Sequence, residues 1–284
     1  MDDPTGKVAL MIAGGGCPQL ENAIGCIKAI KQVDNVDIDE VWGVSAGAIA
    51  GSIFMSMKQD ILAFENLIVE TPIYEWFTLS PWQAIKSIWG KSNHIADNTG
   101  LKEALETYID PETYDKVKVS ISEMEDGRFK RTLVVDGRPS HVLASMSFQH
   151  VFPPVKINGK IYGDGGVNDN IPLPRYVDIP KYKHLYLILA PASPILPSVS
   201  KWKLLDRILR LVDDTMNREL AQVEQLHLED LRNVTVIKPE KWVDSASFLD
   251  WSDGFEQITE SFKLAAKILQ EKKDASMATF PMLP

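Results

Sequence analysis

A serine in a sharp glycine-flanked turn is the first candidate for chemistry in this sequence. Ser45 lies at the centre of a GxSxG pentapeptide, between Gly43 and Gly47. Residues 40–44 read as a short strand and the small residues 46–57 as a helix, and a strand–serine–helix turn is typical of a nucleophile elbow. The pentapeptide alone arises by chance in about one chain in ten of this length. The flanking elements therefore carry the hypothesis, and an incidental serine in a glycine-rich turn is the alternative.

A nucleophilic serine needs a group that takes its proton. The sequence has five histidines, and no pattern around any of them indicates a catalytic base; they are His94, His141, His150, His184 and His227. His184 precedes an apolar strand-like run, which predicts a position at the amino edge of a sheet. Asp164 is the better candidate, because the glycines on both sides (residues 162–166, YGDGG) allow a sharp bend and close approach. A plain Asp-Gly turn is the competing interpretation.

The elements that must position these residues alternate between strands and helices. Val8 to Ala13 is a continuous apolar run that ends at three glycines, which predicts a strand buried on both faces. Asp126-Gly127 and Asn158-Gly159 predict hairpins. Further expected elements are a helix over 20–32, strands at 185–189 and 234–237, and long amphipathic helices over 202–231 and 255–272. This order predicts one α/β sheet between helices, and we expect a single domain over residues 1–284.

Composition limits the function classes. The 284 residues are 45% hydrophobic and carry a net charge of −9, which argues against a nucleic-acid surface and leaves membrane contact to apolar side chains. Cys17 and Cys26 show no metal-ligand spacing, so we expect free thiols and no metal site. The acidic, polar stretch from Met1 to Lys7 does not read as a signal peptide, and no apolar run approaches about 20 residues. We expect a soluble, cytoplasmic protein, with peripheral membrane association an open alternative.

Four segments in the right order resemble the patatin-like phospholipases. Gly14, Gly15 and Gly16 resemble the family's oxyanion loop, and residues 43–47 resemble its nucleophile elbow. Residues 144–145 with 152–155, and Asp164 with Gly165, Gly166, Val167, Asn170 and Pro172, resemble the segments of its second catalytic motif. The similarity spans about residues 7–190, and residues 200–272 add helices and a strand without it.

The resemblance implies a three-layer α/β/α sandwich with a central, mostly parallel sheet. It also implies a Ser45–Asp164 dyad without histidine, an acyl-enzyme intermediate, and an oxyanion hole from the backbone of Gly14 to Gly16, with Ala46 as a further donor. No cofactor is expected. The chain departs from the family after Gly16, where residues 17–20 (CPQL) replace a basic residue and a fourth glycine, and Pro18 removes one N–H donor.

The substrate implied by the resemblance is a phospholipid or another acyl lipid. Residues 73–89 concentrate large aromatic and aliphatic side chains, which fits a lid or acyl pocket as well as simple core packing. A small-ester carboxylesterase or thioesterase, and a catalytically weak lipid-binding effector, are the alternative functions. Some family members require a protein activator, so an activating partner is also an open expectation.

Overall fold

The structure is a computed structural model of the chain. It describes residues 6–71, 76, 78–79, 94, 96–149, 151–171, 178–190, 218, 221, 223–225, 227–228, 231–239 and 254–278. The predicted helix over 202–231 and the aromatic segment 73–89 therefore lie largely outside the described residues, as do His150 and Pro172.

The first half of the sheet is built as the sequence predicts. Strand β1 (Val8–Ile12) leads into helix α1 (Gly16–Ala29), and strand β2 (Glu40–Val44) leads into helix α2 (Ala46–Ser56). Helix α1 begins earlier than the predicted 20–32 because Pro18 occupies its first turn, where a missing N–H breaks no helical hydrogen bond. It continues into a short π-helix, η1 (Ile30–Asp34).

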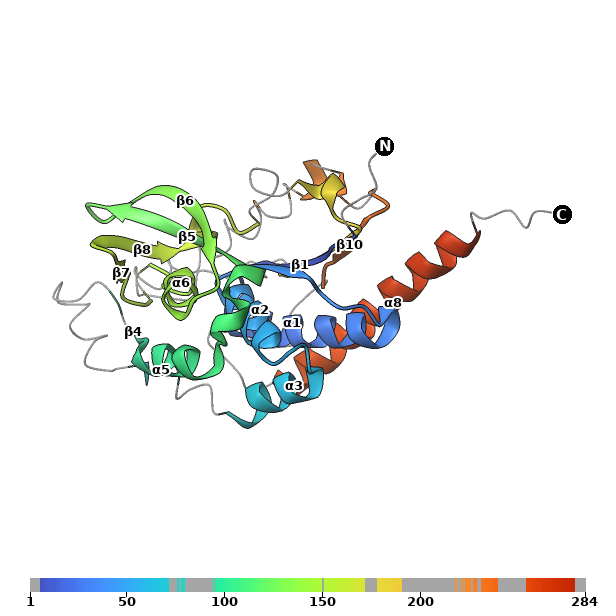
Figure 1. Cartoon of the computed structure of the whole chain (residues 1–284), viewed down its shortest axis with the longest axis horizontal. Helices are drawn as coiled ribbons and strands as arrows, with labels where there is room; N and C mark the ends of the chain where they lie inside the picture. Colours follow the sequence, from blue (N-terminus) through green and yellow to red (C-terminus); the bar gives the residue numbers. More distant parts are fainter. Residues whose placement is uncertain are drawn as a thin grey trace, which may run out of the picture.

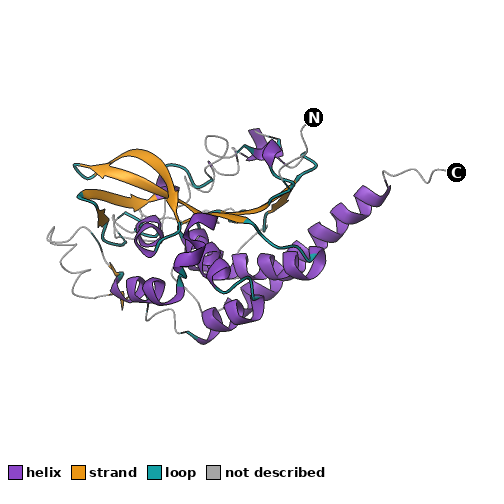
Figure 2. Cartoon of the chain, viewed as in Figure 1, coloured by secondary structure: helices purple, strands orange, loops and turns teal. Residues whose placement is uncertain are grey.

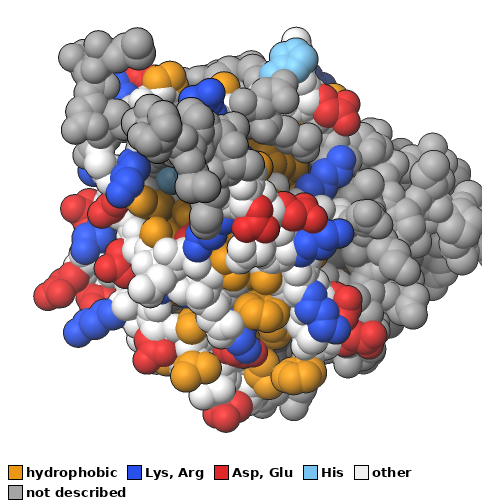
Figure 3. Space-filling view, turned by 90° about the vertical axis from the view of Figure 1, so that its right-hand side faces the viewer, with side chains coloured by type: hydrophobic (Ala, Val, Ile, Leu, Met, Phe, Trp, Pro, Cys, Tyr) orange, Lys and Arg blue, Asp and Glu red, His pale blue; other side chains and the backbone are white. Residues whose placement is uncertain are grey.

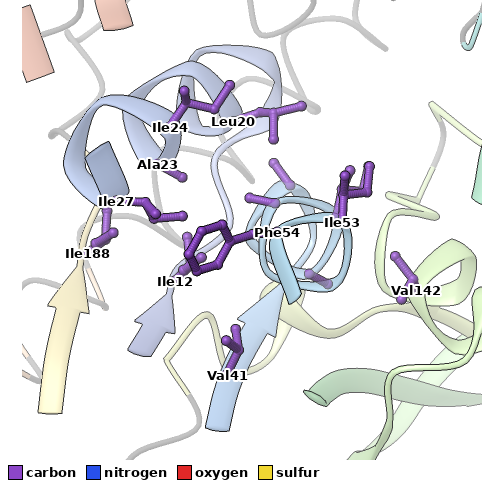
Figure 4. Close-up of a cluster of buried hydrophobic side chains, with 14 of the residues drawn as sticks. Ile12, Leu20, Ala23, Ile24, Ile27, Val41, Ile53, Phe54, Val142 and Ile188 are labelled. Atoms are coloured by element: carbon purple, nitrogen blue, oxygen red, sulfur yellow. The ribbon is translucent and has the colours of Figure 1, made fainter. Parts of the chain in front are cut away.

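Strand β1 is buried on both faces, as its continuous apolar run predicts. Val8, Leu10 and Ile12 join one hydrophobic cluster, whereas Ala9 and Met11 join a second one on the opposite face. The first cluster fills the space between the sheet and helices α1 and α2 (Figure 4). Among the side chains labelled there, those from β1, β2, α1 and α2 are Ile12, Leu20, Ala23, Ile24, Ile27, Val41, Ile53 and Phe54.

The rest of the sheet is mixed in direction. Its strand order is β10-β9-β1-β2-β5-β8-β7, with β6 paired to β5 (Figures 1 and 2). The further strands are β5 (Val117–Glu125), β6 (Arg128–Asp136), β7 (Val155–Ile157), β8 (Lys160–Asp164), β9 (His184–Ile188) and β10 (Val234–Ile237). The pairs from β10 to β5 are parallel, while β5 pairs antiparallel with β6 and β8, and β7 with β8. Of the seven pairings between the described strands of this sheet, four are parallel, so the expected mostly parallel sheet is confirmed.

Both predicted hairpin turns are confirmed. Asp126 and Gly127 have φ angles of 51° and 72°, and Asn158 and Gly159 have φ angles of 50° and 81°. Two consecutive residues with positive φ form the turn that joins tightly twisted antiparallel strands, and Asp-Gly or Asn-Gly is the favoured pair for it.

Several elements were not expected from the sequence. They are the helices α3 (Ile61–Glu70), α5 (Thr99–Tyr108) and α6 (Pro139–Ser145), the short strands β3 (Thr78–Leu79) and β4 (Ala96–Asp97), and the 3₁₀ turns η3 (Pro111–Lys116), η4 (Gly165–Val167) and η5 (Ile179–Lys181). Local signals for two of them exist in hindsight. Asp60 caps α3 by accepting hydrogen bonds from the N–H groups of Leu62 and Ala63, and Pro139 begins α6.

The C-terminal helix α8 (Gly254–Ala278) confirms the amphipathic pattern over 255–272. Ile258, Ala265 and Leu269 are buried and belong to the same core cluster as α1. On the other face of the sheet, Val223 and Leu228 pack with Met11 and Leu187. Side chains therefore cover both faces of the sheet, and the protein has an α/β fold.

Charged side chains of both signs intermix on the described surface around α8 (Figure 3). Ion pairs such as Lys263–Glu260, at 2.6 Å, join exposed groups and contribute little to stability because water screens them. Among the described helices, none is both long and apolar enough to cross a bilayer.

Candidate active site

Strand β5 determines where the two candidate catalytic residues lie. On one edge of β5, Val44 at the end of β2 pairs with Ser120, and Asp164 at the end of β8 pairs with the next residue, Ile121. Strand β6 occupies the other edge over this stretch, so β2 and β8 share a single edge. They run in opposite directions and their carboxyl ends meet there. Ser45, which directly follows Val44, is thereby brought to Asp164, although 119 positions separate them in the sequence (164 − 45).

Ser45 adopts the strained backbone of a nucleophile elbow. Its φ and ψ angles are 53° and −124°, which is rare for a residue with a side chain. Its N–H group donates to Ser145 Oγ at 2.8 Å, and Ser145 Oγ donates to the carbonyl oxygen of Ser120 at 2.7 Å. Ser145, at the end of α6, thus ties the strained turn to the central strand, and this buried bridge helps to hold the strain.

The glycines on both sides of Ser45 are required by close backbone contacts. A Cβ atom at Gly47 would lie 2.3 Å from the carbonyl oxygen of Ile12, and one at Gly43 would lie 2.5 Å from Cα of Ala48. Neither contact leaves room for a side chain. The turn therefore presses directly on β1 and on the first turn of α2, and Ser45 stands at the N-terminus of that helix, where negative charge is stabilised.

The Asp164 carboxyl group is buried and only half satisfied. Its side chain is 1% exposed, and Oδ1 accepts a hydrogen bond of 2.7 Å from the N–H group of Gly166 in the turn that begins at Gly165. Oδ2 has no hydrogen-bond partner of ordinary geometry among the described residues. Burial raises the pKa of this carboxyl from 3.8 to about 7, against the smaller opposing effects of the Ser45 hydroxyl and the Gly166 N–H group.

The Ser45 hydroxyl has two acceptors within reach. It donates to Met146 Sδ at 3.4 Å, and it also acts as a donor toward the Asp164 carboxyl, which lowers that group's pKa. The two contacts compete for one proton. A thioether is a weak acceptor, whereas a carboxylate is a strong one. The Asp164 carboxylate is thus the stronger of the two acceptors for the Ser45 hydroxyl.

The glycine loop after β1 lies directly against the serine. A Cβ atom at Gly14 would lie 2.9 Å from Cβ of Ser45 and 2.5 Å from Asn170 Oδ1. Asn170 holds this backbone at two points, because its Oδ1 accepts from the Gly14 N–H group at 3.0 Å and its Nδ2 donates to the Gly14 carbonyl oxygen at 3.2 Å. The Gly14 N–H group thus already has an acceptor. The N–H groups of Gly15 and Gly16 open helix α1, where backbone donors have no partner within the helix.

Two of the described histidines, His184 and His141, contact groups outside this site. His184 begins β9 at the amino edge of the sheet, as expected, and its Nε2 lies 2.8 Å from Thr235 Oγ1. Burial lowers the pKa of His184 to about 4, with a smaller effect from the charge of Lys272. His141 contacts Asp136 through Nδ1 at 2.7 Å. Neither imidazole is a hydrogen-bond partner of Ser45 or of Asp164.

Sequence reasoning missed the positioning groups around the serine. Ser145 and Asn170 fall in segments that resemble the family, but only the structure shows what their side chains hold. Met146 gave no signal, because a methionine next to a helix end has no special pattern. In the aromatic segment, Trp76 is 4% exposed and accepts a backbone hydrogen bond from Leu101, so this residue packs in the core.

Comparisons with known proteins agree with this architecture. The family model described as patatin-like phospholipase matches residues 10–175, more than half of the chain. Lysophospholipase NTE1 of Kluyveromyces lactis is 23% identical over 177 residues, which are 58% of this chain and only 11% of that protein.

Among solved structures, VipD from Legionella pneumophila superposes with a TM-score of 0.52 at 12% identity, covering 95% of this chain and 67% of that one. ExoU from Pseudomonas aeruginosa, solved with SpcU, gives a TM-score of 0.42 at 13% identity, and the match covers 95% of this chain and 52% of the ExoU chain. The fold is thus shared with VipD at low sequence identity. On the family match, this chain belongs to the patatin-like phospholipases.

Proposed function

We propose that this protein is a serine acyl hydrolase that cleaves carboxylic esters of phospholipids or other acyl lipids, with Ser45 as nucleophile and Asp164 as general base. The observation that carries the proposal is the strand register. Two strands end against adjacent residues of β5, Ser120 and Ile121, and so bring a strained serine to a buried carboxyl group.

The proposed reaction has two halves that use the same two groups. Ser45 Oγ attacks the acyl carbonyl carbon while its proton passes to Asp164. The tetrahedral intermediate then expels the alcohol, which takes that proton, and leaves the acyl group on Ser45. In the second half, water gives a proton to Asp164 and attacks the acyl carbon. The bond to Oγ breaks, Ser45 regains its proton, and a fatty acid leaves.

The raised pKa of Asp164 suits this exchange. A base with a pKa of about 7 is about half ionised at neutral pH, and its ionised form accepts a proton from the hydroxyl far more readily than an ordinary aspartate does. Oδ2, which has no hydrogen-bond partner of ordinary geometry in the described part of the chain, is the atom available to receive that proton. Burial thus supplies basicity that an exposed aspartate lacks.

The negative oxygen of the intermediate needs donors beside Ser45. We assign this role first to the N–H groups of Gly15 and Gly16, with Ala46 at the first position of α2 as a further donor. Gly14 would contribute only if its bond to Asn170 opened. We therefore give Gly14 chiefly the role of holding the loop against the serine.

The lipid class of substrate rests on the family, whose description names phospholipases, and on the curated relative NTE1, which is a lysophospholipase. The test is hydrolysis of 1-palmitoyl lysophosphatidylcholine, phosphatidylcholine vesicles and p-nitrophenyl butyrate by the wild-type protein, Ser45→Ala and Asp164→Asn. A fluorophosphonate label, mapped by mass spectrometry, identifies the reactive residue. We expect the label on Ser45, fatty acid release from lipid, and at least about a 10²-fold loss in each variant.

Each outcome separates one alternative. Hydrolysis of the short ester without fatty acid release from either lipid would identify a small-ester esterase. Binding to vesicles with neither turnover nor labelling would identify a lipid-binding effector. Equal rates for wild type and Ser45→Ala would refute the nucleophile. To include activation by a partner, the lipid assays are repeated with added cell extract, with Ser45→Ala plus extract as the background.

A further inference from the structure

The side chain of Gln19 lies directly against the glycine loop. A Cβ atom at Gly15 would fall 2.8 Å from Cβ and 3.3 Å from Cγ of Gln19, so the two positions are in contact. Gln19 lies in the second half of the first turn of α1, and helical side chains lean toward the N-terminus of their helix. Its side chain is fully buried. An uncharged amide is thus placed beside the loop in a chain that lacks the usual basic residue there.

Neighbouring groups determine which end of this amide is oxygen and which is nitrogen. Asn22 Nδ2 donates to the carbonyl oxygen of Leu189 at 3.1 Å, and a carbonyl can only accept, so this atom of Asn22 is nitrogen. The same Nδ2 lies 2.9 Å from the Gln19 side chain, which must therefore present its oxygen, Oε1. Asn22 is one helical turn further along α1. Nε2 of Gln19 consequently faces away from Asn22.

Nε2 of Gln19 is buried and has no hydrogen-bond partner among the residues that the structure describes. Buried donors are almost always paired, and an unpaired one in a native site calls for a missing acceptor. Three observations suggest what that acceptor is. The Cβ and Cγ atoms of Gln19 lie against the glycine loop, Pro18 deprives this loop of one backbone donor, and the Gly14 N–H group is already held by Asn170. The glycine loop therefore has few free backbone N–H donors, and Nε2 of Gln19 is a buried donor next to it.

We propose that Gln19 Nε2 donates a hydrogen bond to the oxyanion formed when Ser45 attacks the acyl carbonyl, beside the N–H groups of Gly15 and Gly16. This inference rests on the proposed function. It assigns to a side chain the work that the missing backbone donor cannot do, and the Asn22–Leu189 anchor keeps the amide in place before substrate arrives.

The test is Gln19→Met, which keeps an unbranched chain of similar length but has no donor. Kinetics on p-nitrophenyl butyrate and 1-palmitoyl lysophosphatidylcholine should show kcat about 10²-fold lower on both, with KM within about twofold of wild type. The melting temperature should change little, because removal of the buried Nε2 donor offsets the loss of the Asn22–Gln19 hydrogen bond, and Asn22 keeps its bond to Leu189. Should Gln19→Met fail to fold, Gln19→Glu keeps the acceptor for Asn22 without the Nε2 donor.

The matched control is Ser52→Ala. Ser52 on α2 is also fully buried, and its hydroxyl has no hydrogen-bond partner among the described residues, so its loss changes the same kind of group at another position. Turnover of this control should remain within about twofold of wild type.

Wild type and Ser45→Ala are assayed alongside. Turnover by neither would refute the proposed function and this inference with it. With an active wild type, three results overturn the inference alone. The first is an unchanged kcat in Gln19→Met. The second is a higher KM on the lysophospholipid only, which marks a head-group contact. The third is a loss of kcat that matches a fall in melting temperature, which marks a structural role.

Discussion

Replacing Asp164 by asparagine should stabilise the protein at neutral pH while it abolishes turnover. Asparagine has the same shape as the buried carboxyl, and its Oδ1 can still accept from the N–H group of Gly166. It carries no charge at any pH. The variant therefore removes the cost of holding a carboxylate in a site where one oxygen, Oδ2, has no hydrogen-bond partner within the described ranges.

The size of the effect follows from the two pKa values of Asp164. The unfolded chain releases this proton near pH 4, whereas the folded protein holds it until about pH 7. Between these values the folded state binds the extra proton, so this group's contribution to stability is fully present below pH 4 and is lost as pH rises to 7. The two pKa values differ by about three pH units, and each pH unit corresponds to about 1.36 kcal/mol, so ionisation of Asp164 lowers the free energy of unfolding by about 4 kcal/mol.

Urea unfolding of wild type and Asp164→Asn at pH 4.5, 6 and 8 measures this difference. We expect a small difference at the lowest pH and an advantage of up to about 4 kcal/mol for the variant at pH 8. Asp126→Asn is the control, since Asp126 lies in an exposed hairpin turn, and its effect should stay within about 0.5 kcal/mol at each pH. The wild-type kcat/KM should rise about tenfold per pH unit up to about pH 7 and then level off.

Two results would refute this reasoning. A variant less stable than wild type at pH 8, or a stability difference that does not grow with pH, would mean that ionisation of Asp164 does not destabilise the folded protein. A rate that stays flat from pH 5 to 8 in the wild type would mean that the catalytic base is another group. Either result can be obtained without knowing the natural lipid.

Three further substitutions test the groups that position the serine. Ser145→Ala leaves the buried N–H group of Ser45 without its acceptor and should cost about 1–3 kcal/mol in the free energy of unfolding, together with a fall in kcat; unchanged values of both would contradict the bridge. Asn170→Ala removes both hydrogen bonds to Gly14 and should lower the free energy of unfolding, measured in urea, by about 2 kcal/mol; a change near zero would show that these hydrogen bonds do not stabilise the loop. Met146→Leu conserves volume and removes the acceptor that competes for the Ser45 hydroxyl, so kcat should be equal or higher, and a marked loss would give the sulfur a direct role.

Elements with strong local signals could be predicted from the sequence. The apolar run from Val8 and the Asp-Gly and Asn-Gly turns decide their structures within a few residues, and the structure confirms them. The direction of strand pairing could not be predicted in this way. Both edges of β5 are used, and one of them is shared by β2 and β8, which requires contacts between segments far apart in the chain.

The same division holds at the site. The motif glycines could be predicted from the sequence because positions where two backbone segments approach closely require glycine, as at Gly47 against β1. A hydrogen bond such as that from the Ser45 N–H group to Ser145 leaves none, because serine is common and its partner is 100 positions away. The amide nitrogen of Gln19, which has no partner among the described residues, can be recognised only from the three-dimensional positions of its neighbours.

Burial connects the stability of this site with its proposed chemistry. The Asn170 side chain that holds the loop also lies beside the Asp164 carboxyl, since a Cβ atom at Gly166 would lie 2.6 Å from Asn170 Oδ1 and 3.1 Å from Asp164 Oδ1. Burial of this carboxyl raises its pKa. A variant that loosens the packing should therefore lower the pKa of Asp164 toward that of an exposed aspartate and weaken it as a base. Activity would then fall with the pH midpoint of the rate profile moving down, even though neither Ser45 nor Asp164 had been changed.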